Sequence, residues 1–246
     1  MPPALFDPLR PSPRRSNNEC DHFLLARAGE DIVDLIGTPP LRCATIGDPG
    51  ATVLRWFEVH GVTPEPLDPL PLKAGDPDAV LKDPRFHDGV GAYDLVLTLG
   101  LFEQCNMPDL AAAVLAGLLA PGGRLVGVTV GGGSLATLRD ALLAVDRAEG
   151  RAAIRVHPMM DGSGLAGLLA GAGLADPVVN VDRVNVRYSS PHRLVGDLRA
   201  MGCSRRLAAP SPPISKRQWH ALCRQLAAPF IERFDLLHFH AVKRGA

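Results

Sequence analysis

Apolar and polar positions along the chain repeat with two different periods, and the change of period distinguishes buried strands from amphipathic helices. Apolar runs predict strands at 42–46, 93–99 and 124–130, and helical spacing predicts helices at 18–35, 53–59, 108–119 and 134–147. Strands and helices thus follow one another between residues 41 and 148. This order predicts βαβ units and an α/β fold with a doubly wound, mostly parallel sheet.

The C-terminal part of the chain follows a different order. We expect helices at 165–172, 191–201 and 219–226, an alternating strand at 178–188 and a last strand at 234–242. The last strand is expected to be antiparallel, and a helical cap is inserted at about 183–230. Residues 1–16 are rich in Pro and Arg and predict an N-terminal arm, which leaves 17–246 as one domain.

The turn after the first predicted strand reads Gly47-Asp48-Pro49-Gly50. In a sheet of this kind the first strand-to-helix turn can hold a nucleotide-like ligand, because glycines allow a close backbone approach and the helix begins with free N–H groups. Pro49 removes one of those donors. A plain strand-to-helix turn is an equally good interpretation of these residues.

In such a sheet a second strand follows the first helix, here the one at 53–59, and an acidic residue at its end could accept hydrogen bonds from ribose hydroxyls. Glu65 and Asp68 stand at that place, and Asp76 or Asp78 could receive an adenine amino group. The stretch 63–92 is rich in Pro and Asp, so any strand in it must be short. Solvated loop carboxylates remain the alternative for each of these acids.

The segment Tyr93-Asp94-Leu95-Val96, a helix, and then Leu119-Ala120-Pro121-Gly122-Gly123-Arg124-Leu125 form the most specific pattern. It resembles the fourth and fifth strands of class I S-adenosylmethionine (SAM)-dependent methyltransferases. In this pattern Pro121-Gly122-Gly123 is expected to form a tight turn between helix and strand. The resemblance implies a Rossmann-like fold and SAM as the cofactor. The cofactor-binding residues that it implies are Thr45, Gly47, Asp48, Gly50, Asp68, Asp76, Thr98 and Leu99.

Further motifs narrow the resemblance, among them Gly132-Gly133-Ser134-Leu135, 155–161, 168–178, 186–188 and 198–202. They are similar to the family that holds the mitochondrial complex I assembly methyltransferase-like factor, near the malonyl-carrier-protein methyltransferase of biotin synthesis. That resemblance implies methyl transfer to a protein substrate, or SAM-assisted hydroxylation of an arginine. It also implies Arg155, His157, Asp161 and Tyr188 as polar residues near the substrate.

The chain departs from the family at the cofactor loop. Where the family writes "LDLGCGxG", this chain has Thr45 in place of the acid within the strand and Pro49 in place of the middle glycine. Phe102-Glu103 replaces the His-Trp that the family often carries after the fourth strand. These changes favour a second hypothesis, a non-catalytic assembly or scaffold protein. A nicotinamide-dependent oxidoreductase fits the glycine pattern less well.

Formal charge sums to zero over the whole chain, but its two parts differ. Residues 183–246 carry 12 basic and 3 acidic side chains, whereas residues 1–182 carry 14 basic and 23 acidic ones. The basic C-terminal part predicts a protein partner with an acidic surface, unless the two parts of the chain simply pair with one another. Because no basic run is interleaved with aromatic residues, nucleic acid is not favoured as a partner.

The remaining features bear on compartment and metal. Five scattered cysteines without a C-x-x-C pair favour reduced thiols, and the apolar run 110–120 is too short to span a membrane. No apolar signal core is present near the N-terminus, so the expected location is the cytoplasm, or the mitochondrial matrix in a eukaryote. His238 and His240 share one face of the last strand without a third ligand in view, and no metal site is predicted.

Overall fold

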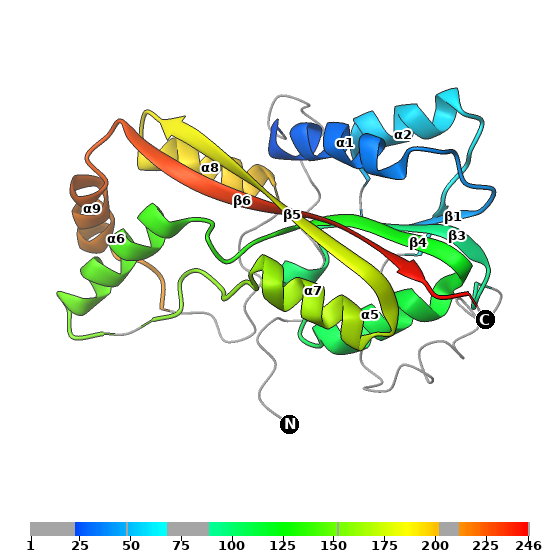
Figure 1. The fold of residues 1–246 in the computed structure, drawn as a ribbon. Coiled ribbons are helices and arrows are strands. Elements are labelled where there is room, and N and C mark those ends of the chain that lie inside the picture. The colour runs from blue at the N-terminus through cyan, green and yellow to red at the C-terminus, as the bar shows by residue number, and fades with distance from the viewer. Residues whose placement is uncertain (1–22, 48, 68–88, 152, 202–211, 246) are drawn as a thin grey trace. The chain divides into compact units, whose positions relative to one another are not determined.

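The computed structural model describes residues 23–47, 49–67, 89–151, 153–201 and 212–245 (Figure 1). The chain divides into two compact units. We call Leu24–Gly131, Met160–Asp182 and Leu236–Ala246 the sheet unit, and Gly132–Met159 with Arg183–Asp235 the helical unit. The predicted cap at 183–230 falls within the helical unit, which also takes in the segment from Gly132. The predicted arm at 1–16 lies outside the described residues.

Secondary structure follows the order expected from the sequence. The sheet unit contains α1 (Phe23–Ile36), β1 (Cys43–Ile46), α2 (Gly50–Val59), β2 (Glu65–Pro66), β3 (Tyr93–Leu99), the 3-10 helix η3 (Phe102–Gln104), α5 (Pro108–Leu118), β4 (Leu119–Val130) and α7 (Gly162–Gly171). The first residue of α1, Phe23, falls outside this unit. The helical unit contains α6 (Ala136–Arg147), α8 (Pro191–Ala200) and α9 (Lys216–Gln225). Two long strands, β5 (Leu174–Tyr188) and β6 (Phe230–Lys243), have residues in both units.

Over the described residues the sheet has six strands in the order β2-β1-β3-β4-β6-β5. The pairs β1–β2, β1–β3 and β3–β4 are parallel, and β6 runs antiparallel to β4. The α/β fold with a mostly parallel sheet and an antiparallel last strand is therefore confirmed. The short β2 also agrees with the brief strand expected in a Pro-rich stretch.

Helices cover both faces of the sheet unit: α1 and α2 lie on one face, and α5 and α7 on the other (Figure 1). A buried hydrophobic cluster joins α5 and α7 to the middle strands, with Val114, Leu115, Leu165 and Phe239 among its members. Nearly every residue of α5 from Leu110 onward is buried, which explains its continuous apolar sequence. The core thus consists mainly of aliphatic side chains, in keeping with an aromatic content of only 5% in the whole chain.

The Pro-Gly-Gly segment differs from the expected tight turn. Pro121, Gly122 and Gly123 lie within β4, which begins directly after α5 at Leu119. Leu119 already pairs with Tyr93, and the register then shifts before Arg124 pairs with Leu95. A Cβ on Gly123 would lie only 2.6 Å from the carbonyl oxygen of Tyr93. Glycine is therefore needed for a close approach of two strands, and the segment is an irregularity within β4.

The start of α6 also differs from the prediction. The helix predicted to begin at Ser134 begins at Ala136, and Ser134 is buried, where its hydroxyl exchanges hydrogen bonds with the backbone of Asp235. The carboxylate of Glu232, which is fully buried in β6, instead accepts from the backbone N–H groups of Thr137 (3.2 Å) and Leu138 (2.8 Å). A distant acid thus satisfies the free donors of the first turn.

A buried ion pair lies at the centre of the helical unit. Asp146 of α6 is bound by both Nε and Nη2 of Arg155, at 2.9 and 2.8 Å, and its side chain is only 2% exposed. Gln218 of α9 donates to the same carboxylate at 3.4 Å. Arg155 also donates to the carbonyl oxygen of Pro212 at 2.6 Å. These bonds connect α6, the segment after it and α9.

Replacing Arg155 by Met is expected to lower the free energy of unfolding by about 3–5 kcal/mol, because it leaves the buried carboxylate of Asp146 without its cation. Urea denaturation measures this change. Arg151→Met is the control, because Arg151 is 55% exposed and lies 3.9 Å from its partner Glu149; its cost should stay below about 0.5 kcal/mol. Equal costs for the two variants would contradict a central role of the buried pair.

Candidate functional site

The candidate site lies at the carboxyl ends of β1 and β3. The chain leaves β1 toward β2 on one side and later returns to β3 on the other side, so the strand order reverses between these two neighbours. Ligands of open α/β sheets bind at such a switch point, outside the carboxyl ends of the strands. Ile46 pairs with Thr98, and Leu99 pairs with Val128 of β4, so three strand ends meet here.

Gly47 occupies the tightest position of this edge. Its φ of +83° is in the left-handed region, and a Cβ built on it would lie 2.9 Å from the carbonyl oxygen of Leu99. The turn after β1 therefore passes directly over the end of β3 in a conformation that only glycine adopts without strain. Gly50, with a φ of +77°, is the first residue of α2. The N-cap residue of α2 is Pro49, which provides no side-chain hydrogen bond to the first turn.

Five of the predicted cofactor residues lie at this edge: Thr45, Gly47, Gly50, Thr98 and Leu99. Thr45 is buried in β1 beside Leu97 of β3. Thr98 is 1% exposed, and its hydroxyl has no hydrogen-bond partner among the described residues. A buried hydroxyl without a partner at a strand end is the kind of group that a ligand can satisfy. Asp48, Asp68 and Asp76 lie outside the described residues, so their predicted roles remain predictions.

Glu65 is held near the amino ends of the strands. The hydroxyl of Tyr93, the first residue of β3, donates to its carboxylate at 2.7 Å, and Arg42 lies 3.8 Å from the same oxygen. Burial, together with this hydrogen bond to a carboxylate, raises the pKa of Tyr93 to about 12. Glu65 therefore belongs to a polar cluster at the opposite edge of the sheet from Gly47.

A buried acid–hydroxyl pair lies next to the carboxyl edge. Glu103 of η3 is 7% exposed, and its carboxylate accepts a short hydrogen bond from the hydroxyl of Thr129 in β4. The same hydroxyl accepts from the backbone N–H of Glu103 at 3.2 Å. Thr129 was not among the predicted site residues. A single polar residue within the apolar run of β4 was the only sequence signal for it.

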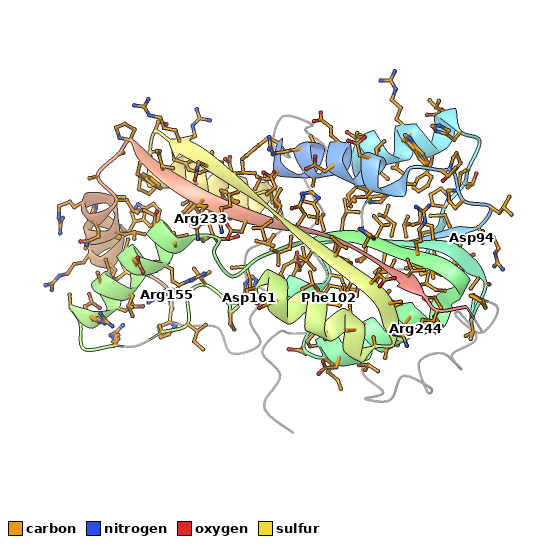
Figure 2. All side chains as sticks on the ribbon, viewed as in Figure 1. Asp94, Phe102, Arg155, Asp161, Arg233 and Arg244 are labelled. Atoms are coloured by element: carbon orange, nitrogen blue, oxygen red, sulfur yellow. The ribbon has the colours of Figure 1, made fainter. Side chains whose placement is uncertain are left out.

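The four residues that the resemblance placed near the substrate have different surroundings. Asp161, in the sheet unit, caps α7 by accepting from Gly164 N (2.7 Å) and the Ser163 hydroxyl (2.8 Å), bonds that lower its pKa (Figure 2). The other three residues belong to the helical unit. There Arg155 binds Asp146.

The other two members of that set, His157 and Tyr188, differ in how deeply they are buried. His157 is half-buried in the segment between α6 and α7. Tyr188 is 3% exposed and stacks on Phe230 with ring centroids 5.9 Å apart. Burial raises the pKa of the Tyr188 hydroxyl. The contacts of Tyr188 and Arg155 fix the interior of the helical unit.

A group of acids and a histidine lies on α1, β5 and β6 in the sheet unit. Ligand-type atoms of Asp31, Asp182 and His238 lie within 4.8 Å of one another. Arg27, however, donates to both oxygens of Asp182, at 2.6 and 3.1 Å, and its positive charge opposes a metal ion at the same carboxylate. These side chains form an ion-pair cluster. His238 is buried, whereas His240 is only half-buried.

Sequence comparison relates about half of this chain to a curated methyltransferase. No model of a known protein family matches the chain. The chain is 28% identical over 128 residues to a malonyl-[acyl-carrier protein] O-methyltransferase of Laribacter hongkongensis, a match that covers 52% of this chain. It spans about two fifths of the length of that curated relative.

Two solved structures share the fold. A putative methyltransferase from Bacillus halodurans has a TM-score of 0.53 at 10% identity, covering 88% of this chain and 98% of that one. The YcgJ protein from Bacillus subtilis has a TM-score of 0.52 at 10% identity, covering 90% and 100%. The chain therefore shares a Rossmann-like α/β fold with these two proteins, the first of which is described as a putative methyltransferase. Within the described residues, no helix is both long and apolar enough to cross a membrane.

The stability of the sheet unit should depend on pH through His238. Burial lowers the pKa of this imidazole below its ordinary value of 6.5, although Asp31 and Asp182 favour its protonated form and Arg27 opposes it. Below pH 6.5 the His238 imidazole is therefore protonated more readily in the unfolded chain than in the folded chain. The free energy of unfolding should fall as the pH falls from about 6.5 toward the folded-state pKa.

Urea titrations between pH 7.5 and 5 measure this dependence, with the pH range set by the ordinary pKa of histidine. His238→Gln should remove the His238 contribution. His220→Gln removes an exposed imidazole from α9 and should leave the His238 contribution to the pH dependence unchanged. An unchanged pH dependence in His238→Gln would contradict the assignment.

Proposed function

We propose that this protein binds SAM at the carboxyl edge of β1, β3 and β4 and transfers its methyl group to a protein substrate. The observation that carries the proposal is the passage of Gly47 over the end of β3, where a Cβ would lie 2.9 Å from the Leu99 carbonyl oxygen. This contact requires glycine at the switch point of the sheet. The class I methyltransferase fold and the 28% identity to an O-methyltransferase support the same conclusion.

The residues of this edge fit a zwitterionic nucleoside ligand. The first turn of α2 presents backbone donors that its N-cap residue leaves without a side-chain acceptor, and the buried hydroxyl of Thr98 can hydrogen-bond to a ligand. When bound, SAM supplies an electrophilic methyl group on a sulfonium. The protein must then align the acceptor and exclude water. Glu103, held by Thr129, provides a fixed carboxylate beside this edge that can orient a donor group on the substrate.

A non-catalytic assembly protein is the second candidate. Thr45 stands within β1 where the resembling family has an acid, and it is 4% exposed. Pro49, at the N-cap of α2, has no N–H to offer to a ligand. Both features reduce the polar contacts available at the edge. Titration with the cofactor separates the two candidates, because a scaffold role needs no SAM binding.

The substrate that we propose is a protein with an acidic surface, in respiratory complex I assembly or a related role. Charge supports an acidic partner: residues 183–246 carry 12 basic and 3 acidic side chains. Two of those three acids, Glu232 and Asp235, are buried and already engaged with α6 and Arg233. Within residues 183–246, few exposed acidic side chains are therefore present to neutralise the basic ones.

Calorimetric titration with S-adenosylhomocysteine tests the cofactor proposal. We expect binding tighter than about 1 mM, the upper limit of typical substrate affinities. Gly47→Ala should weaken binding at least ~10-fold, because the added Cβ meets the Leu99 carbonyl group and displaces the turn. Thermal unfolding in parallel reports whether each variant remains folded.

Gly61→Ala is the matched control for this experiment. Gly61 also has a positive φ, +66°, so its alanine carries a similar backbone strain of about 1–2 kcal/mol, but no atom lies within 4 Å of its Cβ position. Cofactor affinity should remain at the wild-type value. Equal affinities of the two variants, or wild-type binding no tighter than about 1 mM, would overturn the proposal.

Transfer of tritiated methyl groups from SAM to lysate proteins tests the partner. We expect an acidic protein to be labelled, with less label at 150 mM than at 10 mM salt, because the screening length falls from about 30 Å to about 8 Å. Arg217→Glu, on exposed α9, should reduce labelling, whereas Arg55→Glu, on exposed α2, is the charge-matched control. Labelling that is insensitive to salt and to Arg217→Glu would contradict the charge argument.

A further inference from the structure

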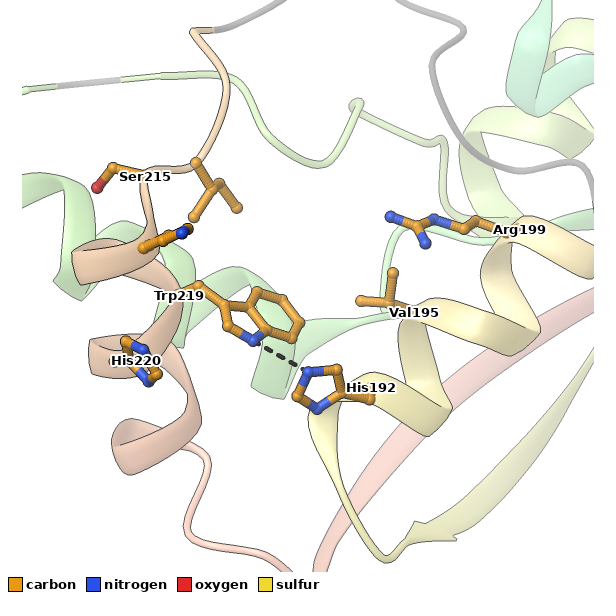
Figure 3. Close-up of a pocket in the computed structure, with 8 residues that line it drawn as sticks. His192, Val195, Arg199, Ser215, Trp219 and His220 are labelled. Atoms are coloured by element: carbon orange, nitrogen blue, oxygen red, sulfur yellow. Dashed lines mark hydrogen bonds between the residues drawn. The ribbon is translucent and has the colours of Figure 1, made fainter.

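A separate pocket of about 350 Å³ lies within the helical unit, between α8 and α9 (Figure 3). Its volume is within the range of small-molecule sites. Of the residues that the structure describes, those lining it belong to the helical unit: His192, Val195, Arg199, Ile214, Ser215, Lys216, Trp219 and His220. Arg199 falls in the motif at 198–202, and none of the eight residues belongs to the proposed SAM site.

One wall of the pocket is aromatic and held in place. The indole N–H of Trp219 donates to Nε2 of His192 at 3.2 Å, and the two rings meet edge to face with centroids 4.8 Å apart. The bond fixes the Trp219 ring against α8, so that its remaining surface lines the pocket. Val195 and Ile214 add aliphatic surface. This wall is suited to a flat apolar group.

Two further lining residues, Arg199 and Lys216, are cationic. The side chains of Arg199 and Lys216 are exposed, and neither forms an ion pair or a hydrogen bond with a side chain or backbone group that the structure describes. Figure 3 shows Arg199 reaching toward the pocket from α8, opposite Trp219 on α9. A guanidinium with free donors can bind a phosphate or carboxylate through two parallel hydrogen bonds. The pocket thus combines an aromatic wall with two cationic side chains that no described residue neutralises.

The pocket is also preorganised. Ser215 begins α9 with a reciprocal capping box: its hydroxyl accepts from Gln218 N at 3.2 Å, and the Gln218 side chain accepts from Ser215 N at 2.9 Å. The amide group of Gln218 also donates to Asp146 of α6. The helix that carries Lys216 and Trp219 is therefore anchored to a buried carboxylate. Preorganisation of this kind lowers the cost of binding a ligand.

From these contacts we infer that the helical unit binds a small anion carried on a flat apolar ring, such as an aryl phosphate or an aryl carboxylate. The ring lies against Trp219, Val195 and Ile214, and the anionic group binds Arg199 and Lys216. Neither half of the ligand is sufficient: a bare anion leaves the apolar wall exposed, and an uncharged ring leaves both cations unpaired. The inference is independent of SAM binding.

Intrinsic fluorescence tests this inference directly. The chain has two tryptophans, Trp56 in α2 and Trp219 in α9, so Trp56→Phe leaves Trp219 as the single reporter. In this background, phenyl phosphate and benzoate should each change the emission saturably. Phenol and inorganic phosphate, which present the ring or the anion alone, should bind at least ~10-fold more weakly.

Two substitutions on the same helix identify the site. Arg199→Gln should raise the dissociation constant for phenyl phosphate about 10-fold or more, because it removes a charge-assisted pair. Arg193→Gln changes an exposed arginine of α8 that does not line the pocket and should leave the constant within about twofold.

The absence of a saturable response to either ring anion below ~10 mM would overturn the inference. Equal weakening by Arg193→Gln and Arg199→Gln would do the same, since it would reveal general charge attraction. The measurement does not involve S-adenosylhomocysteine, so its result is distinct from the test of the SAM site.

Discussion

The helical unit depends on one carboxylate that has been removed almost completely from water. Asp146 is 2% exposed, and an ionised acid at such a position is stable only when donors surround it. Arg155 supplies two of these donors, and Gln218 supplies a third. Because the donors come from different segments, satisfying one charge fixes the positions of α6, the segment that follows it and α9. These hydrogen bonds to Asp146 therefore also fix the position of α9, which forms one side of the pocket.

The strands and most helices could be predicted because their apolar periods are local properties of the sequence. The start of α6 could not be predicted in this way, because Glu232, whose carboxylate caps the helix, is 94 residues away from Leu138 in the sequence. A nearby serine was the better candidate on local evidence. The same limit applies to Pro121–Gly123, where the reason for glycine is the Tyr93 carbonyl oxygen of a neighbouring strand. Local patterns report the element, whereas long-range contacts decide how it begins and ends.

The candidate site was predictable in part for a topological reason. The ends of parallel strands meet at one edge, so residues following β1 and β3, such as Gly47 and Thr98, had to come together. The pair formed by Glu103 and Thr129 could not be anticipated, because it depends on the register of β4 and on the path of η3. Arg155 shows the opposite case: a motif drew attention to it, and the structure gives it a buried ionic partner.

The capping of α6 by Glu232 has a consequence for the order of folding during synthesis. At about 5–20 residues per second, the ribosome makes Glu232 roughly 5–20 s after Leu138, so α6 waits that long for its cap. Strand β6, which carries Glu232, also lies between β4 and β5 in the finished sheet. The parallel strands β1, β3 and β4 can assemble early, but β5 must wait for a strand that is made after it. Both the pairing of β5 in the sheet and the capping of α6 therefore require β6, which is made after either of them.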